Sequence, residues 1–214
     1  MSPDRPMAPL PVYILAGGRS RRFGSDKARA ELAGRPLIRR LADAVSPFAL
    51  SITVVADIAG KYVDLGLHTI ADREPSLGPI GGLATVLADA EVRQVGPWLA
   101  LLSCDWAFIP PEWPASLLHA AANIPNAQAI AYHHNHWEPL LALYHQSLLP
   151  IVDRAIIRGE RTMWRLLESI QTVAMPLPNA AALMQINTPA DHAAAQMIIN
   201  HQEHEAQRST NEST

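Results

Sequence analysis

The chain contains a single cysteine, Cys104, in 214 residues, so an internal disulfide is excluded. This scarcity is compatible with a reducing compartment. The sequence also lacks an apolar run long enough to span a membrane. Its polar, proline-rich start lacks the apolar core of a signal peptide. We therefore expect a cytoplasmic protein that does not interact with membranes.

Charged residues are also scarce. They make up 17% of the chain, and the net charge is −3. Without an excess of positive charge we expect no broad basic surface and no nucleic-acid partner. Hydrophobic residues reach 49%, which is typical of a globular protein. The length suits one α/β domain, which we place at residues 11–200, between a flexible arm (residues 1–10) and a polar, disordered tail (residues 201–214).

Positive charge is concentrated in one early loop. Residues 15–27 have the sequence LAGGRSRRFGSDK and follow an apolar run that predicts a buried strand at residues 11–15. Residues 17–27 include three glycines, three arginines and a lysine. Glycine lets the backbone approach a ligand closely, successive N–H groups form a concave anion site, and Arg and Lys add full charges. A strand followed by such a loop indicates a polyphosphate site.

Two common phosphate-binding loops are excluded by spacing. A Walker loop requires Gly-Lys-Ser/Thr, whereas Lys27 is separated from Gly24 and is followed by alanine. A dinucleotide fingerprint requires Gly-x-Gly-x-x-Gly, which Gly17, Gly18 and Gly24 do not match. The alternative interpretation of the loop is a polar glycine turn whose arginines are merely solvated.

Strand-like and helix-like segments alternate along the chain. Apolar or β-branched runs predict strands near residues 11–15, 52–56, 68–72, 98–102, 127–132, 140–144 and 173–175. Helical spacing predicts helices near residues 37–45, 78–90, 115–122, 148–157 and 162–170, and after Pro189. This alternation indicates a doubly wound α/β sheet, whose ligands lie beyond the carboxyl ends of the strands. The close return strand at residues 140–144 would be antiparallel, so we predict a mixed, mostly parallel sheet.

A carboxylate follows the predicted strand at residues 98–102. Asp105 would therefore lie at the carboxyl edge of the sheet, where the first loop also lies. Mg²⁺ takes one or two carboxylates together with substrate phosphates, so we interpret Asp105 as a magnesium ligand. The alternative is a cap for the helix that begins near Pro110. We interpret Cys104 as packed, because nothing in the sequence marks it as a reactive thiol.

Three other segments have ordinary structural explanations. The glycine pair that begins at Gly81 allows either close helix packing or backbone approach to a base or ribose. The turn before Arg161 is typical of a helix C-cap with an arginine on the helix surface. Asn187 or Thr188 is expected to cap the last helix.

The first loop resembles the signature Leu-Ala-Gly-Gly-x-Ser-x-Arg-Phe/Met-Gly-x-Asp-Lys of the molybdenum cofactor guanylyltransferases, the MobA family of nucleotidyltransferases. Three later segments are similar to the family pattern: Asp72 with the Gly-Pro-Ile-Gly-Gly that begins at Gly78, the Cys-Asp that ends at Asp105, and the Asn-Thr-Pro that begins at Asn187. The resemblance covers nearly the whole chain.

Three positions depart from the family pattern. Ala107 replaces a proline, Gln185 replaces the first asparagine of Asn-x-Asn-Thr-Pro, and Ala56 replaces an asparagine after the second strand. The departure at Gln185 weakens the assignment on the pterin side. Asp57 is a candidate to replace the missing asparagine at the second strand.

The resemblance implies a three-layer αβα, Rossmann-like nucleotide-diphospho-sugar transferase fold and a set of site residues. The catalytic group would comprise Lys27, Arg19, Arg22 and Asp105, with Asp105 holding Mg²⁺. The residues implied for GTP binding are Leu15, Ala16, Gly17, Gly18, Lys27, Asp72, Gly78, Gly81 and Asp105. Those implied for molybdopterin binding are Arg161 and Asn187.

The resemblance further implies transfer of GMP from GTP to Mo-molybdopterin, with release of pyrophosphate. The Ala-Gly-Gly at residues 16–18 favours guanine, because related cytidylyltransferases more often have Ala-Ala-Gly there. The alternatives are a nucleotidyltransferase that uses CTP or a sugar phosphate, and a non-catalytic nucleotide sensor. We expect a monomer that makes transient contacts with molybdenum-insertion proteins and acceptor molybdoenzymes.

Overall fold

A computed structural model describes residues 9–17, 26–109, 112–177 and 183–211. Its centre is a seven-stranded sheet with the order β10-β8-β9-β6-β1-β4-β5. In chain order the strands are β1 (Leu10–Leu15), β4 (Ala49–Ala56), β5 (His68–Ala71), β6 (Trp98–Ser103), β8 (Ala129–His133), β9 (Trp137–His145) and β10 (Thr172–Pro176). Only β9 runs antiparallel to its neighbours, β6 and β8. The predicted mixed, mostly parallel sheet is confirmed.

The central strands form because their sequences are almost continuously apolar. Every residue of β1 is buried, as are the middle four residues of β6. Strands covered on both faces have this continuous pattern rather than an alternating one. β1 and β6 pair in parallel with Leu15 opposite Ser103, so both strands end at the same edge of the sheet.

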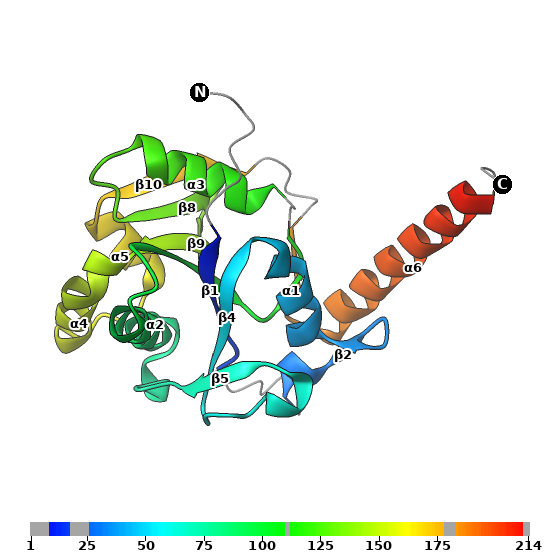
Figure 1. The fold of residues 1–214 in the computed structure, drawn as a ribbon, viewed down its shortest axis with the longest axis horizontal. Coiled ribbons are helices and arrows are strands. Elements are labelled where there is room, and N and C mark those ends of the chain that lie inside the picture. The colour runs from blue at the N-terminus through cyan, green and yellow to red at the C-terminus, as the bar shows by residue number, and fades with distance from the viewer. Residues whose placement is uncertain (1–8, 18–25, 110–111, 178–182, 212–214) are drawn as a thin grey trace.

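Helices cover both faces of the sheet (Figure 1). One face packs against α1 (Leu37–Val45) and α3 (Trp113–Asn123), and its core includes Ile14, Ile38 and Trp113. The opposite face packs against α2 (Pro79–Arg93), α4 (Leu149–Ile157) and α5 (Met163–Ser169), and its core includes Leu15 and Leu83. The expected three-layer αβα arrangement is therefore confirmed.

Short elements complete the fold at the sheet edge. β7 (Trp106–Phe108) pairs antiparallel with β11 (Met184–Gln185), and β2 (Glu31–Leu32) pairs with β3 (Arg35–Pro36). The last helix, α6 (Pro189–Asn211), shares a small core with β2. The 3₁₀ turns are η1 (Lys27–Arg29), η2 (Ser46–Phe48), η3 (Val63–Leu65), η4 (Pro75–Leu77) and η5 (Gln146–Leu148). None of the described helices is both long enough and apolar enough to cross a membrane.

The two ends of the described chain differ from the sequence-based expectation. β1 begins at Leu10, which is buried, so the expected arm does not extend to residue 10. Residues 201–211, expected to be disordered, continue α6 as helix, and Figure 1 shows this helix projecting from the body. The segment is polar, but six of its eleven residues are Glu, Gln, Ala or Arg, which favour helix. Low hydrophobicity did not predict this helix, because a helix that is already anchored at its start can extend without forming a new nucleus.

We expect the central strand β6 to be highly sensitive to loss of side-chain volume. Leu101 is fully buried in the core beneath α2 and α4, so Leu101→Ala should lower the free energy of unfolding by about 2–5 kcal/mol. Urea unfolding followed by circular dichroism measures this change. Leu50→Ala is the control because Leu50 is 56% exposed, and it should shift stability by less than about 0.5 kcal/mol. Equal midpoints for the two variants would contradict the prediction.

Candidate functional site

The candidate site lies where β1, β4 and β6 end. Cys104 N donates to Leu15 O at 3.0 Å, and Ala16 N donates to Val55 O at 2.9 Å. The chain that leaves β1 therefore starts beside the chain that leaves β6. Asp105 follows directly, which confirms that it lies at the same edge as the start of the first loop.

Three of the predicted site residues meet at this edge. Lys27 Nζ lies 3.3 Å from Asp105 Oδ2 and donates to Asn187 Oδ1 at 3.2 Å. The side chains of Lys27 and Asp105 are 14% and 19% exposed, so the ion pair is largely shielded but reachable from solvent. The contacts join segments separated by 78 and 160 positions in the chain.

Asp105 and Asn187 are brought together by the small β7–β11 sheet. Gln185 pairs with Trp106, and Ile186 N donates to Asp105 O at 2.8 Å. Asn187 follows immediately and reaches Lys27. A two-residue strand has little intrinsic stability, so this placement depends on tertiary packing of the surrounding chain.

The cap of α6 separates the roles of the two residues considered for it. Thr188 Oγ1 accepts from Asp191 N at 3.2 Å, and the Asp191 carboxylate accepts from the backbone N–H groups of Asn187 and Thr188 at 2.8 and 2.7 Å. Thr188 therefore provides the side-chain cap, while the Asn187 side chain faces Lys27. These backbone N–H groups also lower the pKa of Asp191, because they stabilise its charged form.

Asp105 is held by its own strand as well. Ser103 Oγ donates to Asp105 Oδ1, which leaves Oδ2 on the side of Lys27. The alternative of a cap for the next helix is wrong, because the residue before α3 is Glu112. Burial raises the pKa of the Cys104 thiol to about 12, so the thiol is neutral near pH 7. This agrees with a packed, unreactive cysteine.

Asp72 lies just beyond β5 and is tied into the same region by hydrogen bonds. Its N–H donates to Ala56 O at 2.7 Å, and its Oδ1 accepts from Thr85 Oγ1 at 2.8 Å and from Glu74 N at 3.1 Å. The carboxylate therefore joins the segment after β5 to α2. Its predicted contact with guanine or ribose stays a prediction.

The glycines around α2 have clear packing reasons. A Cβ at Gly81 would lie 2.7 Å from Glu74 O, and a Cβ at Gly82 would lie 2.9 Å from both Cδ atoms of Leu15. Gly78 has φ of +68°, a conformation that favours glycine. Close packing thus explains the pair that begins at Gly81. The same packing sets the distance between α2 and the end of β1. The nucleotide-binding role assigned to Gly78 and Gly81 stays a prediction, because packing already accounts for the glycine at position 81.

Arg161 lies in the turn between α4 and α5. Gly159 there has φ of +88°, as expected for a helix C-cap. The exposed guanidinium of Arg161 donates to Ile156 O at 3.1 Å and to Glu160 O at 2.7 Å. Neither contact reaches Asn187, so these bonds do not join the two predicted molybdopterin residues.

Part of the predicted loop lies outside the described residues. Gly18, Arg19 and Arg22 fall within residues 18–25, and their assignments stay predictions. Gly17 is described and exposed, and a side chain there would meet nothing within 4 Å among the described atoms. Packing among the described residues therefore does not require glycine at this position.

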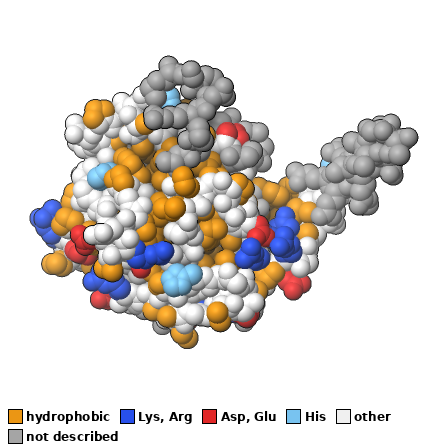
Figure 2. Space-filling model, in the orientation of Figure 1, with side chains coloured by type: hydrophobic (Ala, Val, Ile, Leu, Met, Phe, Trp, Pro, Cys, Tyr) orange, Lys and Arg blue, Asp and Glu red, His pale blue; other side chains and the backbone are white. Residues whose placement is uncertain are grey.

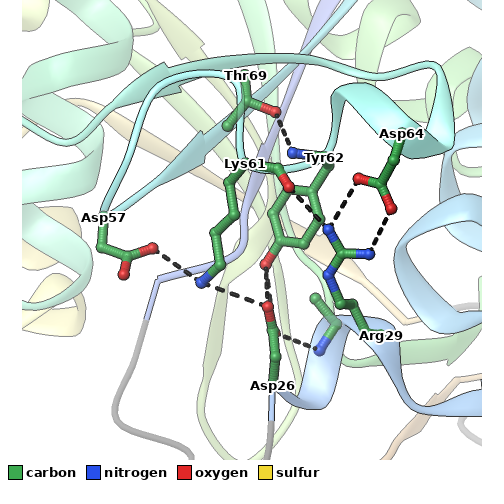
Figure 3. Close-up of polar contacts among 8 residues, drawn as sticks. Asp26, Arg29, Asp57, Lys61, Tyr62, Asp64 and Thr69 are labelled. Atoms are coloured by element: carbon green, nitrogen blue, oxygen red, sulfur yellow. Dashed lines mark hydrogen bonds and ion pairs between the residues drawn. The ribbon is translucent and has the colours of Figure 1, made fainter.

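The structure adds a polar cluster that the sequence did not indicate (Figure 3). Asp26 accepts from the Tyr62 hydroxyl at 3.0 Å and lies 3.3 Å from Lys61 Nζ. Asp57, the candidate replacement for the missing asparagine, instead pairs with Lys61 at 2.8 Å. The hydrogen bond from Lys61 lowers the pKa of Asp57. Only the position of Asp26 next to Lys27 could have drawn attention to this cluster.

The donor set is compatible with a hard divalent cation. The described residues contain no group of three or more His, Cys, Asp or Glu side chains that could hold a metal ion. Asp105 supplies one carboxylate beside the Ser103 hydroxyl, and Lys27 Nζ contacts both this carboxylate and the Asn187 amide oxygen. Mg²⁺ commonly uses one or two carboxylates and completes its shell with water and phosphate oxygens. The oxygen atoms of these side chains match this coordination preference.

On the face shown in Figure 2, basic and acidic side chains of the described residues lie close to one another and form no broad patch of one sign.

Comparisons with known proteins address the family of the chain. The MobA-like NTP transferase domain matches residues 12–174. A probable molybdenum cofactor guanylyltransferase of Deinococcus radiodurans is 33% identical over 187 residues, which cover 87% of this chain and 94% of the relative. A molybdenum cofactor guanylyltransferase of Pseudomonas fluorescens is 30% identical over 197 residues, with 88% and 94% covered.

Solved structures agree with this relationship. Molybdopterin-guanine dinucleotide biosynthesis protein A from Archaeoglobus fulgidus superimposes with a TM-score of 0.74 at 26% identity, covering 90% of this chain and 100% of that one. A CMP:2-keto-3-deoxy-manno-octonic acid synthetase shares the fold, with a TM-score of 0.69 at 12% identity and with 91% and 100% covered. The extent of these matches and the meeting of Lys27 with Asp105 lead to one conclusion: the chain belongs to the MobA-like NTP transferases and is a nucleotidyltransferase.

Proposed function

We propose that the protein transfers GMP from GTP to the terminal phosphate of Mo-molybdopterin, forming the guanine dinucleotide cofactor and releasing pyrophosphate. The observation that carries this proposal is the contact of Lys27 with both Asp105 and Asn187 at the edge where the first loop begins. The names of the relatives support the choice of nucleotide and acceptor.

The reaction needs positioning and charge neutralisation more than it needs a base. A phosphate oxygen of molybdopterin forms a bond to the α-phosphorus of GTP, and the bond from that phosphorus to the bridging oxygen of pyrophosphate breaks. The nucleophile is already anionic near neutral pH. The main obstacle is the repulsion between two anions, so binding and electrostatics dominate such transfers.

Lys27 and Asp105 are suited to opposite parts of this task. The ammonium of Lys27 would bind phosphate oxygens, assisted by Arg19 and Arg22. Asp105 would hold Mg²⁺, which neutralises charge on the reacting phosphates when it is bound. The ion pair between Lys27 and Asp105 holds the two side chains against each other while substrate is absent. On substrate binding, Lys27 would exchange Asp105 for phosphate oxygens, and Asp105 would become available to hold the metal.

Separate sets of residues are assigned to the two substrates. Guanine and ribose would contact backbone groups of the first loop and of the segment before α2. These residues are Leu15, Ala16, Gly17, Gly18, Asp72, Gly78 and Gly81. Asn187 is the contact that the family resemblance implies for the pterin, and its side chain accepts a hydrogen bond from Lys27. Arg161 is the second predicted contact, and it would have to exchange its carbonyl partners for the ligand.

The test is mass analysis of the product formed from GTP, Mg²⁺ and Mo-molybdopterin, with pyrophosphate release measured in parallel. We expect the guanine dinucleotide as product and lower turnover with CTP or UTP. Preference for CTP, or turnover only with hexose 1-phosphates, would replace the proposal with another transferase activity. Nucleotide binding without pyrophosphate release would indicate a sensor.

We also propose that the protein acts as a cytoplasmic monomer that contacts molybdenum-insertion proteins and acceptor molybdoenzymes transiently. Light scattering of the purified protein measures the monomer directly. A stable dimer at micromolar concentration would contradict this part of the proposal.

Asp105→Asn should reduce turnover of GTP by on the order of a hundredfold or more, because the carboxylate that holds the metal is lost. Steady-state kinetics over a range of Mg²⁺ concentrations measures the change. Asp89→Asn is a matched control: Asp89 is 20% exposed, accepts from the Tyr13 hydroxyl at 2.7 Å and pairs with Arg93 at 3.4 Å, away from the site. Similar losses in both variants would show that the effect is not specific to the metal position.

Lys27→Ala should lower kcat/KM for GTP by at least about a hundredfold, because a cation directed at the phosphates is removed. Lys27→Arg should recover only part of this loss, because the planar guanidinium replaces a compact point charge. Pyrophosphate release measures both variants. Full activity of Lys27→Ala would exclude the assigned role.

A further inference from the structure

The short turn that carries Lys27 is bound at both of its ends to one neighbouring segment, residues 57–69. Lys27 is the first residue of η1 (Lys27–Arg29), a 3₁₀ turn of three residues. Such a short turn does not fix its own orientation, because its hydrogen bonds are few and poorly aligned. The direction of the Lys27 side chain must therefore be set by tertiary contacts. Figure 3 shows how the two residues that flank this part of the chain, Asp26 and Arg29, contact residues 57–69.

The first fastening acts on Asp26, the N-cap of η1. Asp26 Oδ1 accepts from Ala28 N at 3.1 Å, which is a standard side-chain cap. The hydroxyl of Tyr62 lies 3.2 Å from Oδ1 and 3.0 Å from Oδ2 of the same carboxylate. Lys61 Nζ lies 3.3 Å from Oδ2. The cap thus has a fixed position relative to Tyr62.

The second fastening acts on Arg29, the last residue of η1. Its guanidinium binds both carboxylate oxygens of Asp64 at 2.7 and 2.8 Å and donates to Lys61 O at 2.8 Å. It also lies over the Tyr62 ring, with its central carbon 5.2 Å from the ring centroid. Arg29 and Asp64 are both substantially exposed, so this contact is worth less than its geometry suggests.

Tyr62 is the rigid member of the cluster. Its side chain is fully buried, it belongs to the core beneath α1, and its backbone N–H points to Thr69 Oγ1 at 3.4 Å. Burial, followed by the charge of Asp26, raises the pKa of the phenol, so it stays protonated and keeps its proton for donation. A buried phenol whose ring is packed on all sides is a fixed point from which Asp26 can be held.

The cluster also offsets a charge that would oppose catalysis. Asp26 places a negative charge beside the residue proposed to bind polyphosphate. Desolvation alone would lower the pKa of Lys61, but its hydrogen bond to Asp57 and the charge of Asp26 outweigh this and raise it. Lys61 is therefore positively charged near neutral pH. The chain has only two lysines: Lys27 follows Asp26 in the sequence, and Lys61 lies 3.3 Å from the Asp26 carboxylate.

We propose that Tyr62 is a positioning residue that acts through Asp26: its hydroxyl fixes the N-cap of η1 so that the Lys27 ammonium is directed at Asp105 and Asn187. This inference deepens the proposed function and rests on it for its effect on the rate. The Tyr62 hydroxyl hydrogen-bonds to Asp26, and its effect on the reacting atoms would pass from Asp26 to Lys27.

The first test is a double-mutant cycle between Tyr62 and Lys27. Tyr62→Phe keeps the buried ring and removes the hydroxyl, and we expect it to lower kcat for GTP about tenfold, as expected for a supporting contact. In the Lys27→Ala background the same change should alter kcat by less than about twofold, because residues that act through one another are not additive. An equal loss in both backgrounds would overturn the proposal.

A second readout needs no substrate. Acetic anhydride labelling followed by peptide mass spectrometry reports on each of the two lysines separately. Labelling of Lys27 should rise severalfold in Tyr62→Phe, because the ammonium is no longer held against Asp105 and Asn187. Unchanged labelling would overturn the positioning role even if the rate falls. If labelling of Lys27 increases in Tyr62→Phe but the wild-type protein forms no guanine dinucleotide, the positioning role of Tyr62 is supported and the proposed function is rejected.

Two further variants guard against a trivial loss of stability. Tyr132→Phe removes the hydroxyl of another buried tyrosine, on β8, which hydrogen-bonds to Ser116 at 3.0 Å. This variant should change neither kcat nor the labelling of Lys27. Asp26→Asn keeps an acceptor for Tyr62 and Ala28, so it should retain more activity than Asp26→Ala. Equal activity of the two Asp26 variants would show that the cap is not the route of the effect.

Discussion

The parallel pairing of β1 with β6 is the constraint on which the rest of the site depends. Because the two strands end together, with Leu15 opposite Ser103, the chain leaving each strand enters the same space. Lys27 reaches that space after a loop and Asp105 reaches it directly, and the ion pair between them closes the arrangement. The helices on either face stabilise the pairing by excluding water from both sides of the strands.

Much of the fold followed from short-range patterns. Continuous apolar runs placed the parallel strands, and the close return strand required the antiparallel β9. The extent of α6 was not predictable in the same way, because polar composition alone does not distinguish a solvated helix from disorder. β7 and β11 have two or three residues each, and no pattern of that length predicts a strand.

The sequence predicted that the first loop and Asp105 would meet at one sheet edge, because each follows a strand that ends there, and Lys27 does contact Asp105. The site was not predictable where support comes from elsewhere in the fold. Tyr62 lies in an irregular segment with no helical or strand period, and its link to Asp26 arises only when β4 and β5 place that segment beside η1. The sequence allowed either close packing or approach to a nucleotide at Gly81, because the close approach of Glu74 depends on the three-dimensional arrangement of the chain.

The small β7–β11 sheet has a consequence for how the protein matures. Asn187 belongs to a segment that follows every strand of the large sheet, and it is held by pairing with β7 and by the core that α6 shares with β2. During synthesis the large sheet can therefore form first, while the Lys27–Asp105 pair still lacks its third member. A chain interrupted before this segment would lack Asn187 and the β7–β11 pairing that places Asn187 beside Lys27.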